Sequence, residues 1–106
     1  MNAHDRRIAL ELKEKITQFT PILDFRMFGS RARGDNDDDS DMDIFIAVET
    51  LDRELREKIT DTAWEVGYLN DFLHISPLIF TRYEIEESPM RASSIIQAIV
   101  EEGIRI

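Results

Sequence analysis

The sequence predicts a small α/β (α+β) domain. Two observations carry this prediction. Apolar residues recur at helical spacing in three segments, and they alternate with polar residues or form short apolar runs in three others. The segments follow the order helix, strand, turn, strand, helix, strand, helix, and 106 residues suit one modest hydrophobic core. No repeat or linker divides the chain, so we expect one domain over residues 1–106.

The first half of the chain gives a helix and two strands. Residues 5–18 repeat apolar side chains at helical spacing and end before Pro21, which predicts an amphipathic helix. Residues 22–28 alternate and predict a strand with Phe25 and Met27 on one face. The polar segment 31–40 predicts a short helical turn and an exposed loop, and residues 41–48 predict a second strand.

The second half gives a helix, a strand and a final helix. Residues 51–67 predict an amphipathic helix capped by Thr50 and ended by Gly67. Residues 72–80 predict a third strand, and Pro77 places it at a sheet edge or a bulge because proline lacks an N–H. Ser88 with the following proline predicts the start of the last helix, which ends at Gly103 before a short strand over 104–106.

Composition excludes several classes of function. The 22 acidic and 13 basic residues give a net charge of -9, which disfavours generic nucleic-acid binding. The absence of cysteine excludes disulfides and thiolate catalysis and is consistent with a reducing compartment. No apolar stretch approaches the roughly 20 residues that span a bilayer, so we expect no membrane insertion and a cytoplasmic protein.

Six aspartates fall within residues 35–43. Most of them are typical of a solvated acidic loop. Asp41 and Asp43 differ because they lie inside the apolar alternation of the second strand, on one face, where two carboxylates can converge on a hard divalent cation such as Mg²⁺. An EF-hand calcium loop is excluded, since Ser40 stands where that loop needs glycine and Ile46 where it needs glutamate.

A Gly29-Ser30 pair precedes Asp41-Met42-Asp43 by ten residues and follows the first strand. A Gly-Ser turn that enters a helix offers backbone N–H groups and a hydroxyl to the phosphates of a nucleotide. The carboxylates would then hold Mg²⁺ ions that bridge triphosphate oxygens. For Arg31 the sequence leaves open a phosphate contact or a solvent-facing side chain.

The stretch FGSRARGDNDDDSDMDIFI resembles the minimal nucleotidyltransferase (MNT) branch of the DNA polymerase β superfamily. The resemblance implies a polymerase β-like fold, a small mixed sheet flanked by helices. It also implies Mg²⁺-dependent transfer of AMP from ATP to a hydroxyl, with Asp41 and Asp43 as catalytic metal ligands and Gly29, Ser30 and Arg33 at the nucleotide. Members of this branch are typically antitoxins paired with HEPN-domain ribonuclease toxins, so a toxin partner and a hetero-oligomer are expected.

One feature departs from the family pattern. Active relatives carry a third carboxylate on a later strand, but the interior of the strand DFLHISPLIF has no acid. His74 is our first choice for that position, Ser76 is second, and Asp71 fits only if the strand begins earlier. This departure leaves an alternative open, a degenerate MNT domain that acts on its partner by binding alone. Trp64 and Tyr68 are expected to cover core or a partner surface.

Overall fold

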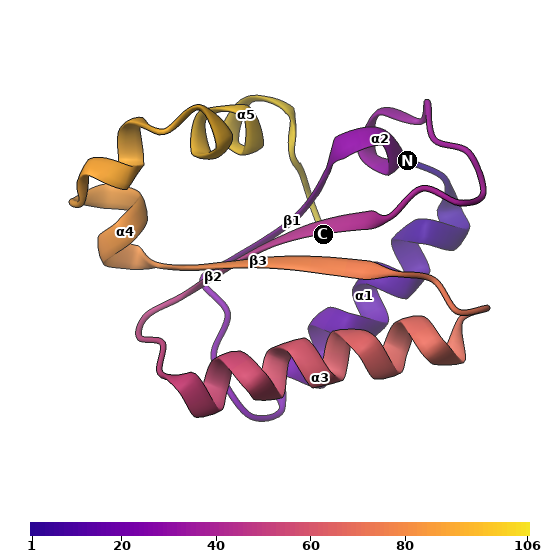
Figure 1. The fold of residues 1–106 in the computed structure, drawn as a ribbon, viewed down its shortest axis with the longest axis horizontal. Coiled ribbons are helices and arrows are strands. Elements are labelled where there is room, and N and C mark those ends of the chain that lie inside the picture. The colour runs from indigo at the N-terminus through magenta and orange to yellow at the C-terminus, as the bar shows by residue number, and fades with distance from the viewer.

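The protein is described over residues 1–106 by a computed structural model. Its elements follow the predicted order, with two short helices added between the third strand and the last helix (Figure 1). The elements are α1 (Ala3–Thr17), β1 (Asp24–Phe28), α2 (Gly29–Arg33), β2 (Met42–Val48), α3 (Arg53–Leu69), β3 (Ile75–Thr81), α4 (Arg82–Glu86), the 3₁₀ helix η1 (Pro89–Ala92), α5 (Ser94–Glu102) and β4 (Ile104–Arg105).

The four strands form one mixed sheet in the order β3-β2-β1-β4. β1 is antiparallel to both β2 and β4, and β2 is parallel to β3. The parallel pair needs a crossover, which α3 supplies along one face of the sheet (Figure 1). This arrangement confirms the small mixed sheet flanked by helices. None of the helices combines the length and the apolar run that a bilayer crossing requires.

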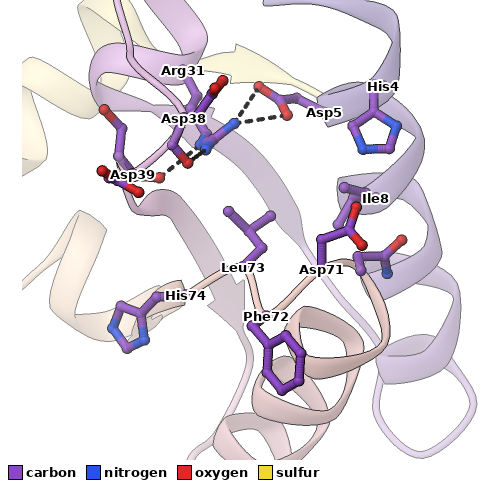
Figure 2. A pocket seen from close by; sticks show the side chains of 12 residues that line it. His4, Asp5, Ile8, Arg31, Asp38, Asp39, Asp71, Phe72, Leu73 and His74 are labelled. Carbon is purple, nitrogen blue, oxygen red and sulfur yellow. Dashed lines mark hydrogen bonds and ion pairs between the residues drawn. The ribbon is translucent and has the colours of Figure 1, made fainter.

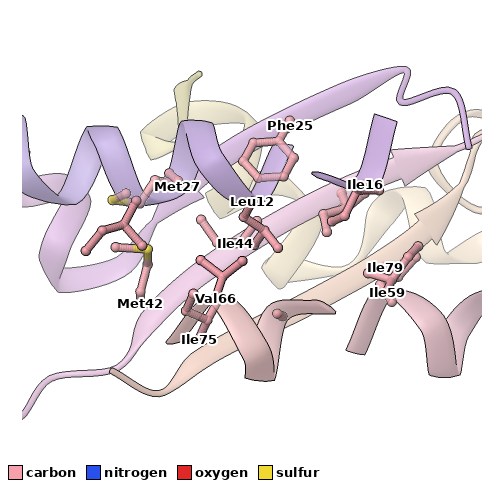
Figure 3. Packing of buried hydrophobic residues seen from close by; sticks show 14 of the residues in the cluster. Leu12, Ile16, Phe25, Met27, Met42, Ile44, Ile59, Val66, Ile75 and Ile79 are labelled. Carbon is pink, nitrogen blue, oxygen red and sulfur yellow. The ribbon is translucent and has the colours of Figure 1, made fainter. Parts of the chain in front are cut away.

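One face of the sheet carries the main core, between the strands and helices α1 and α3 (Figure 3). Alternate residues of β2 point into it and are fully buried, as the period-2 pattern predicts: Met42, Ile44, Ile46 and Val48. They meet Leu12 and Ile16 of α1 and Ile59 and Val66 of α3. Met27 of β1 lies in the same core.

The other face of the sheet carries a smaller core under α5. Phe45 and Ala47 of β2 and Phe80 of β3 pack there with two isoleucines of α5, Ile96 and Ile99. The rings of Phe45 and Phe80 lie 5.8 Å apart between centroids. β2 is therefore buried on both faces from Ile44 onward, and polar side chains on the α5 face occur only at its first residues.

The position of Pro77 in β3 confirms the predicted sheet edge. Met42 N–H donates to the carbonyl of His74 at 2.9 Å, and Met42 is paired with Ile75. In a parallel ladder the backbone N–H and C=O groups of alternate residues point to opposite sides of the strand. The backbone groups of Pro77, like those of Ile75, therefore point away from β2. Its missing N–H therefore costs no ladder hydrogen bond.

Several predicted helix ends were wrong. Asp52 caps α3 instead of Thr50, with its carboxylate accepting from Leu55 N–H at 2.8 Å. α3 also continues past Gly67 to Leu69, and that glycine is required because a Cβ there would lie 2.0 Å from the carbonyl oxygen of Leu73.

The last predicted helix is divided in two. Ser88 caps only the short 3₁₀ helix η1, and a second serine, Ser93, caps α5.

The third strand begins at Ile75 instead of residue 72, because a turn at residues 70–72 precedes it.

Candidate active site

The two carboxylates predicted as metal ligands lie at the start of β2. Asp43 is the second residue of this strand and is paired with Phe28, the last residue of β1. Asp41 precedes the strand by one residue, so alternation places its side chain on the same face as that of Asp43. Asp41 is exposed and Asp43 is half-buried. No ion pair of the chain uses either carboxylate.

Gly29 brings the Gly-Ser turn directly against Asp43. Its φ of +75° is in the left-handed region, and a Cβ built on it would lie 2.5 Å from Oδ2 of Asp43. Only glycine satisfies both the backbone conformation and the close approach. The structure thus joins the two halves of the sequence motif, because the carboxylate lies over the turn from which α2 begins.

Ser30 follows in the first turn of α2 and is half-buried. The residue before the helix is Phe28, which provides no side-chain cap, so no side chain of the chain occupies the first N–H groups of α2. Gly34 ends the helix in the left-handed conformation, with its N–H donating to the carbonyl of Ser30 at 2.8 Å. The turn is closed within five residues and leaves its N-terminal end facing the carboxylates.

The electrostatics of the site centre on Asp43. Burial raises the pKa of the Asp43 carboxyl above its ordinary value, and the negative charge of Asp41 raises this pKa further. The charges of His74 and Arg33 act in the opposite direction. Neither carboxylate forms an ion pair, and their mutual repulsion is an arrangement that a bound cation would relieve.

Arg33 lies at the end of α2 with its side chain half exposed. Its guanidinium contacts Asp35 at 3.1 Å and Glu102 at 4.0 Å, and its charge is near enough to lower the pKa of Asp43. Both ion pairs are exposed, and such pairs are worth little in water. Arg33 is therefore free to exchange them for a phosphate near Asp43.

Arg31 occupies neither of the places that the sequence left open. It is buried, and its Nη1 donates to both carboxylate oxygens of Asp5 at 3.0 and 3.1 Å (Figure 2). Its other nitrogens donate to the backbone carbonyls of Ser40 at 2.9 Å and Asp38 at 3.3 Å. Arg31 thus ties α1 and α2 to the aspartate loop that leads into Asp41.

Sequence reasoning missed the role of Asp5 entirely. As a whole residue it is 1% exposed, less than any other charged residue, although it lies in the first turn of an amphipathic helix. The signal that would have found it is weak. Asp5 lies one helical turn before Ile8 and two before Leu12, so it continues the buried stripe of α1. A buried acid needs a cationic partner.

Ser76 is the residue of β3 directly opposite Asp43 in the parallel ladder. His74 precedes it by two residues and is exposed on the same face, near enough for its charge to lower the pKa of Asp43. Asp71 lies in the turn before β3 and is not part of the strand. The position facing the carboxylate pair across the ladder therefore holds a hydroxyl instead of an acid.

The residues present fit a magnesium ion that shares its ligands with a substrate. No group of three or more acidic, histidine or cysteine side chains lies close enough to hold a metal alone. Mg²⁺ typically uses one or two carboxylates and completes its shell with water and substrate phosphates. Asp41 and Asp43 supply that number of hard oxygen donors, and neither carboxylate is engaged in an ion pair.

A polar hollow of about 390 Å³ lies beside the site, between α1, the aspartate loop and the 70–74 turn (Figure 2). His4, Asp38, Asp39 and His74 are among its lining residues. Asp41, Asp43, Gly29 and Ser30 do not line it. Asp41 is exposed and Asp43, Gly29 and Ser30 are half-buried, so the carboxylates and the Gly-Ser turn are open to solvent.

A mixed sheet with two carboxylates at a strand start, opposed to a Gly-Ser turn, is the arrangement of a nucleotidyltransferase. The family model of the nucleotidyltransferase domain matches residues 6–106, and the chain belongs to that family. The expected polymerase β-type family is thus confirmed. No curated protein matches the chain.

Solved structures have the same fold. A crystal structure of a toxin-antitoxin with AMP-PNP is 20% identical, with 90% of this chain and 69% of that chain covered and a TM-score of 0.59. A mutant of the MntA-HpeT toxin-antitoxin is 18% identical over 99% of this chain and 72% of that chain, with a TM-score of 0.60. A Sulfolobus solfataricus protein described as a nucleotidyltransferase is 20% identical over 96% and 81%, with a TM-score of 0.51. The first two resemblances are to toxin-antitoxin structures.

Proposed function

We propose that this chain transfers AMP from ATP to a hydroxyl group of a partner protein in a Mg²⁺-dependent reaction. The observation that carries the proposal is the contact between Asp43 and the Gly29 turn. It places a pair of unpartnered carboxylates beside free backbone N–H groups, which are the two components that bind a metal-bound triphosphate.

In the proposed reaction the acceptor oxygen attacks the α-phosphorus of ATP. The bond between that phosphorus and the oxygen bridging to the β-phosphate breaks, pyrophosphate leaves with the bonding electrons, and the hydroxyl loses its proton. When bound, Mg²⁺ offsets the charge that develops on the leaving pyrophosphate. The acceptor keeps AMP through a new phosphate ester.

Each predicted site residue has a role in this proposal. Asp41 and Asp43 hold the metal, and Gly29 and Ser30 bind the β- and γ-phosphates through the start of α2. Arg33 exchanges its exposed ion pairs for a phosphate oxygen. His74, whose imidazole is exposed on the same face, accepts the proton of the acceptor hydroxyl.

The acceptor belongs to a partner protein. The candidate site is open to solvent, so a hydroxyl on the surface of a second protein can reach it. We propose that the chain is the antitoxin of a toxin-antitoxin pair and that its partner is a HEPN-domain ribonuclease toxin. Two similar structures, one of them with AMP-PNP, are described as toxin-antitoxins. The net charge of -9 suits a protein that covers an RNA-binding surface.

A second candidate function is neutralisation by binding alone. The observation that favours it is that the residue of β3 opposite Asp43 is Ser76, which has a hydroxyl and no carboxylate. In that case the chain occupies the toxin without modifying it, and the carboxylates are dispensable for neutralisation.

One experiment separates the two candidates. If a HEPN-type toxin is encoded beside this chain, it is purified and incubated with the protein, Mg²⁺ and ATP, and its intact mass is measured. Transfer predicts one or more added AMP units, which the double variant Asp41→Asn/Asp43→Asn abolishes. Unmodified toxin that is nonetheless silent in a stable complex supports binding alone.

The control removes the same number of charges from the same loop. Asp38→Asn/Asp39→Asn replaces two exposed carboxylates whose side chains lie outside the carboxylate pair. This variant should transfer AMP at the wild-type rate. Equal loss of transfer in both double variants would contradict the assignment of Asp41 and Asp43 as metal ligands.

A further inference from the structure

Three aromatic side chains form a continuous exposed stripe along the end of α3 and the turn that follows it. Trp64 is 67% exposed, Phe72 is 79% exposed, and Tyr68 between them is also exposed. The rings of Trp64 and Tyr68 are stacked with centroids 5.3 Å apart, and Phe72 meets Tyr68 edge-on at 5.0 Å. We call these three residues the aromatic stripe. They cover no core, which excludes one of the two roles expected for Trp64 and Tyr68.

The turn presents Phe72 in a fixed, unfavourable conformation. Asp71 and Phe72 have φ values of +61° and +58°, and neither is a glycine. Bulky residues rarely adopt this region, so the surrounding structure must impose it. Leu73 N–H donates to the carbonyl of Gly67 at 2.9 Å, and the Asn70 amide donates to that of Val66 at 2.8 Å. The most exposed aromatic ring is therefore held outward by the fold.

The surroundings of the stripe carry unpaired negative charge. Asp61 and Glu65 lie three residues before Trp64 and Tyr68 on α3, and Asp71 precedes Phe72. All three carboxylates are exposed, and none has an ion-pair partner. An apolar centre with an acidic border fits a partner surface that has an apolar centre and a basic border.

The stripe is continuous with the candidate active site. A hollow of about 380 Å³ runs along the open edge of β3 and is lined by the whole stripe at one side and by His74, Ser76 and Pro77 at the other. Ser76 is the residue opposite Asp43. A polypeptide seated on the stripe is thus within one strand of the carboxylates.

We propose that the aromatic stripe, with Asp61, Glu65 and Asp71 around it, is the docking surface for the acceptor protein, and that this protein presents an apolar patch bordered by lysine or arginine. The inference rests on the proposed function, because it assigns the surface that brings the hydroxyl to the site. A second copy of this chain is disfavoured as occupant, since it would bring two acidic borders together at a net charge of -9 per chain.

The test measures binding of the purified toxin to this chain without ATP or Mg²⁺, so that binding is separated from transfer. Phe72→Asn removes the ring and keeps a residue that tolerates the left-handed backbone. Together with Trp64→Ala it should raise the Kd at least tenfold. The control is Tyr83→Ala, which removes an aromatic ring of similar exposure, 61%, from α4. It should leave the Kd unchanged.

The electrostatic part of the proposal has its own variants. Asp61→Lys/Glu65→Lys reverses the charge beside the stripe and should weaken the complex at least tenfold, most strongly at low salt. Glu87→Lys/Glu101→Lys makes the same change in charge at exposed positions elsewhere and should have a much smaller effect. Equal effects of the two pairs would mean that only net charge matters and would overturn the proposal.

The outcomes separate this proposal from the proposed function. If the complex depends on the stripe but the toxin gains no AMP, the transfer reaction is wrong and the docking surface stands. If the toxin is modified and Trp64→Ala/Phe72→Asn binds it as tightly as wild type, the docking surface is wrong. The proposal is also overturned if these variants raise only the KM for ATP, or if they dissociate a dimer of this chain.

Discussion

Arg31 and Asp5 form a buried ion pair that joins the first helix to the loop leading into Asp41 and Asp43. The two residues are 26 positions apart in the sequence, and their side chains are 8% and 2% exposed. Because Arg31 also donates to the carbonyls of Ser40 and Asp38, one guanidinium fixes the path of the chain directly before Asp41. The pair is thus a positioning element for the site as well as part of the fold.

Breaking this pair from the acidic side should be strongly destabilising. Asp5→Asn leaves the Arg31 guanidinium buried without a counter-charge, and loss of one partner from a buried pair costs about 3–5 kcal/mol. The free energy of unfolding from urea denaturation measures the effect. Glu57→Gln, which breaks the exposed pair of Glu57 with Arg53, is the control and should cost no more than about 1 kcal/mol. Similar losses for both variants would contradict the structural role of Asp5.

Gly29→Ala should destabilise the protein more than Gly34→Ala. Both glycines have φ values in the left-handed region, +75° and +87°, so both variants bear the backbone strain of about 1–3 kcal/mol. Only Gly29 also has the Asp43 carboxylate 2.5 Å from a built Cβ, whereas the nearest atom to that of Gly34 is 3.9 Å away. The difference between the two free energies of unfolding reports the clash. It should shrink when both glycine variants are measured in an Asp43→Ala background, and no change there would exclude the contact.

Local pattern predicted the elements of the site because each depends on near neighbours in sequence. The alternation of β2 placed Asp41 and Asp43 on one face, and the Gly-Ser pair marked the turn before α2. Pro77 marked the sheet edge for a similar reason, since its missing N–H is a local property. The family came from the resemblance of the stretch FGSRARGDNDDDSDMDIFI to the MNT branch, which also implied the polymerase β-like fold.

The features that the sequence did not predict depend on contacts between distant segments or on a choice between residues of equivalent type. No local signal pairs Arg31 with Asp5, because burial of that ion pair is created only when α1 packs beside α2. Asp and Thr are both residue types that cap helices well, so Thr50 and Asp52 are equally suitable in the sequence. The structure begins α3 after Asp52. Trp64 and Tyr68 have apolar side chains at helical spacing, so only the packed structure reveals that they face outward.

The stability of the metal-free protein should respond to the raised pKa of Asp43. The folded state binds a proton at this carboxyl more readily than the unfolded chain, whose pKa is about the ordinary 3.8. Stability from this group is therefore present at low pH and is lost as pH rises through the interval between the ordinary and the raised pKa. Asp43→Asn removes this pH-dependent loss of stability. In EDTA, the Tm of the variant minus the Tm of wild type should therefore increase as the pH rises above about 4.

The control for this pH dependence is Asp38→Asn, which removes one exposed carboxylate from the same loop. A Tm difference between Asp43→Asn and wild type that falls with pH would contradict the desolvation of Asp43. Addition of Mg²⁺ at neutral pH should reverse the order of the two proteins, because a cation that binds only the folded wild type stabilises it.

Placing a carboxylate opposite Asp43 should strengthen the metal site and weaken the metal-free protein. Ser76→Asp adds a third negative charge beside Asp41 and Asp43, which already repel each other. Without divalent cations its Tm should fall below that of wild type. A third hard oxygen ligand should also tighten Mg²⁺ binding on the order of tenfold, so the rise in Tm on adding MgCl₂ should be larger than in wild type. Ser94→Asp adds the same charge at an exposed position on α5 and should leave the response to Mg²⁺ unchanged. If Ser76→Asp responds to Mg²⁺ no more than wild type, residue 76 is not a position from which a third carboxylate reaches the metal.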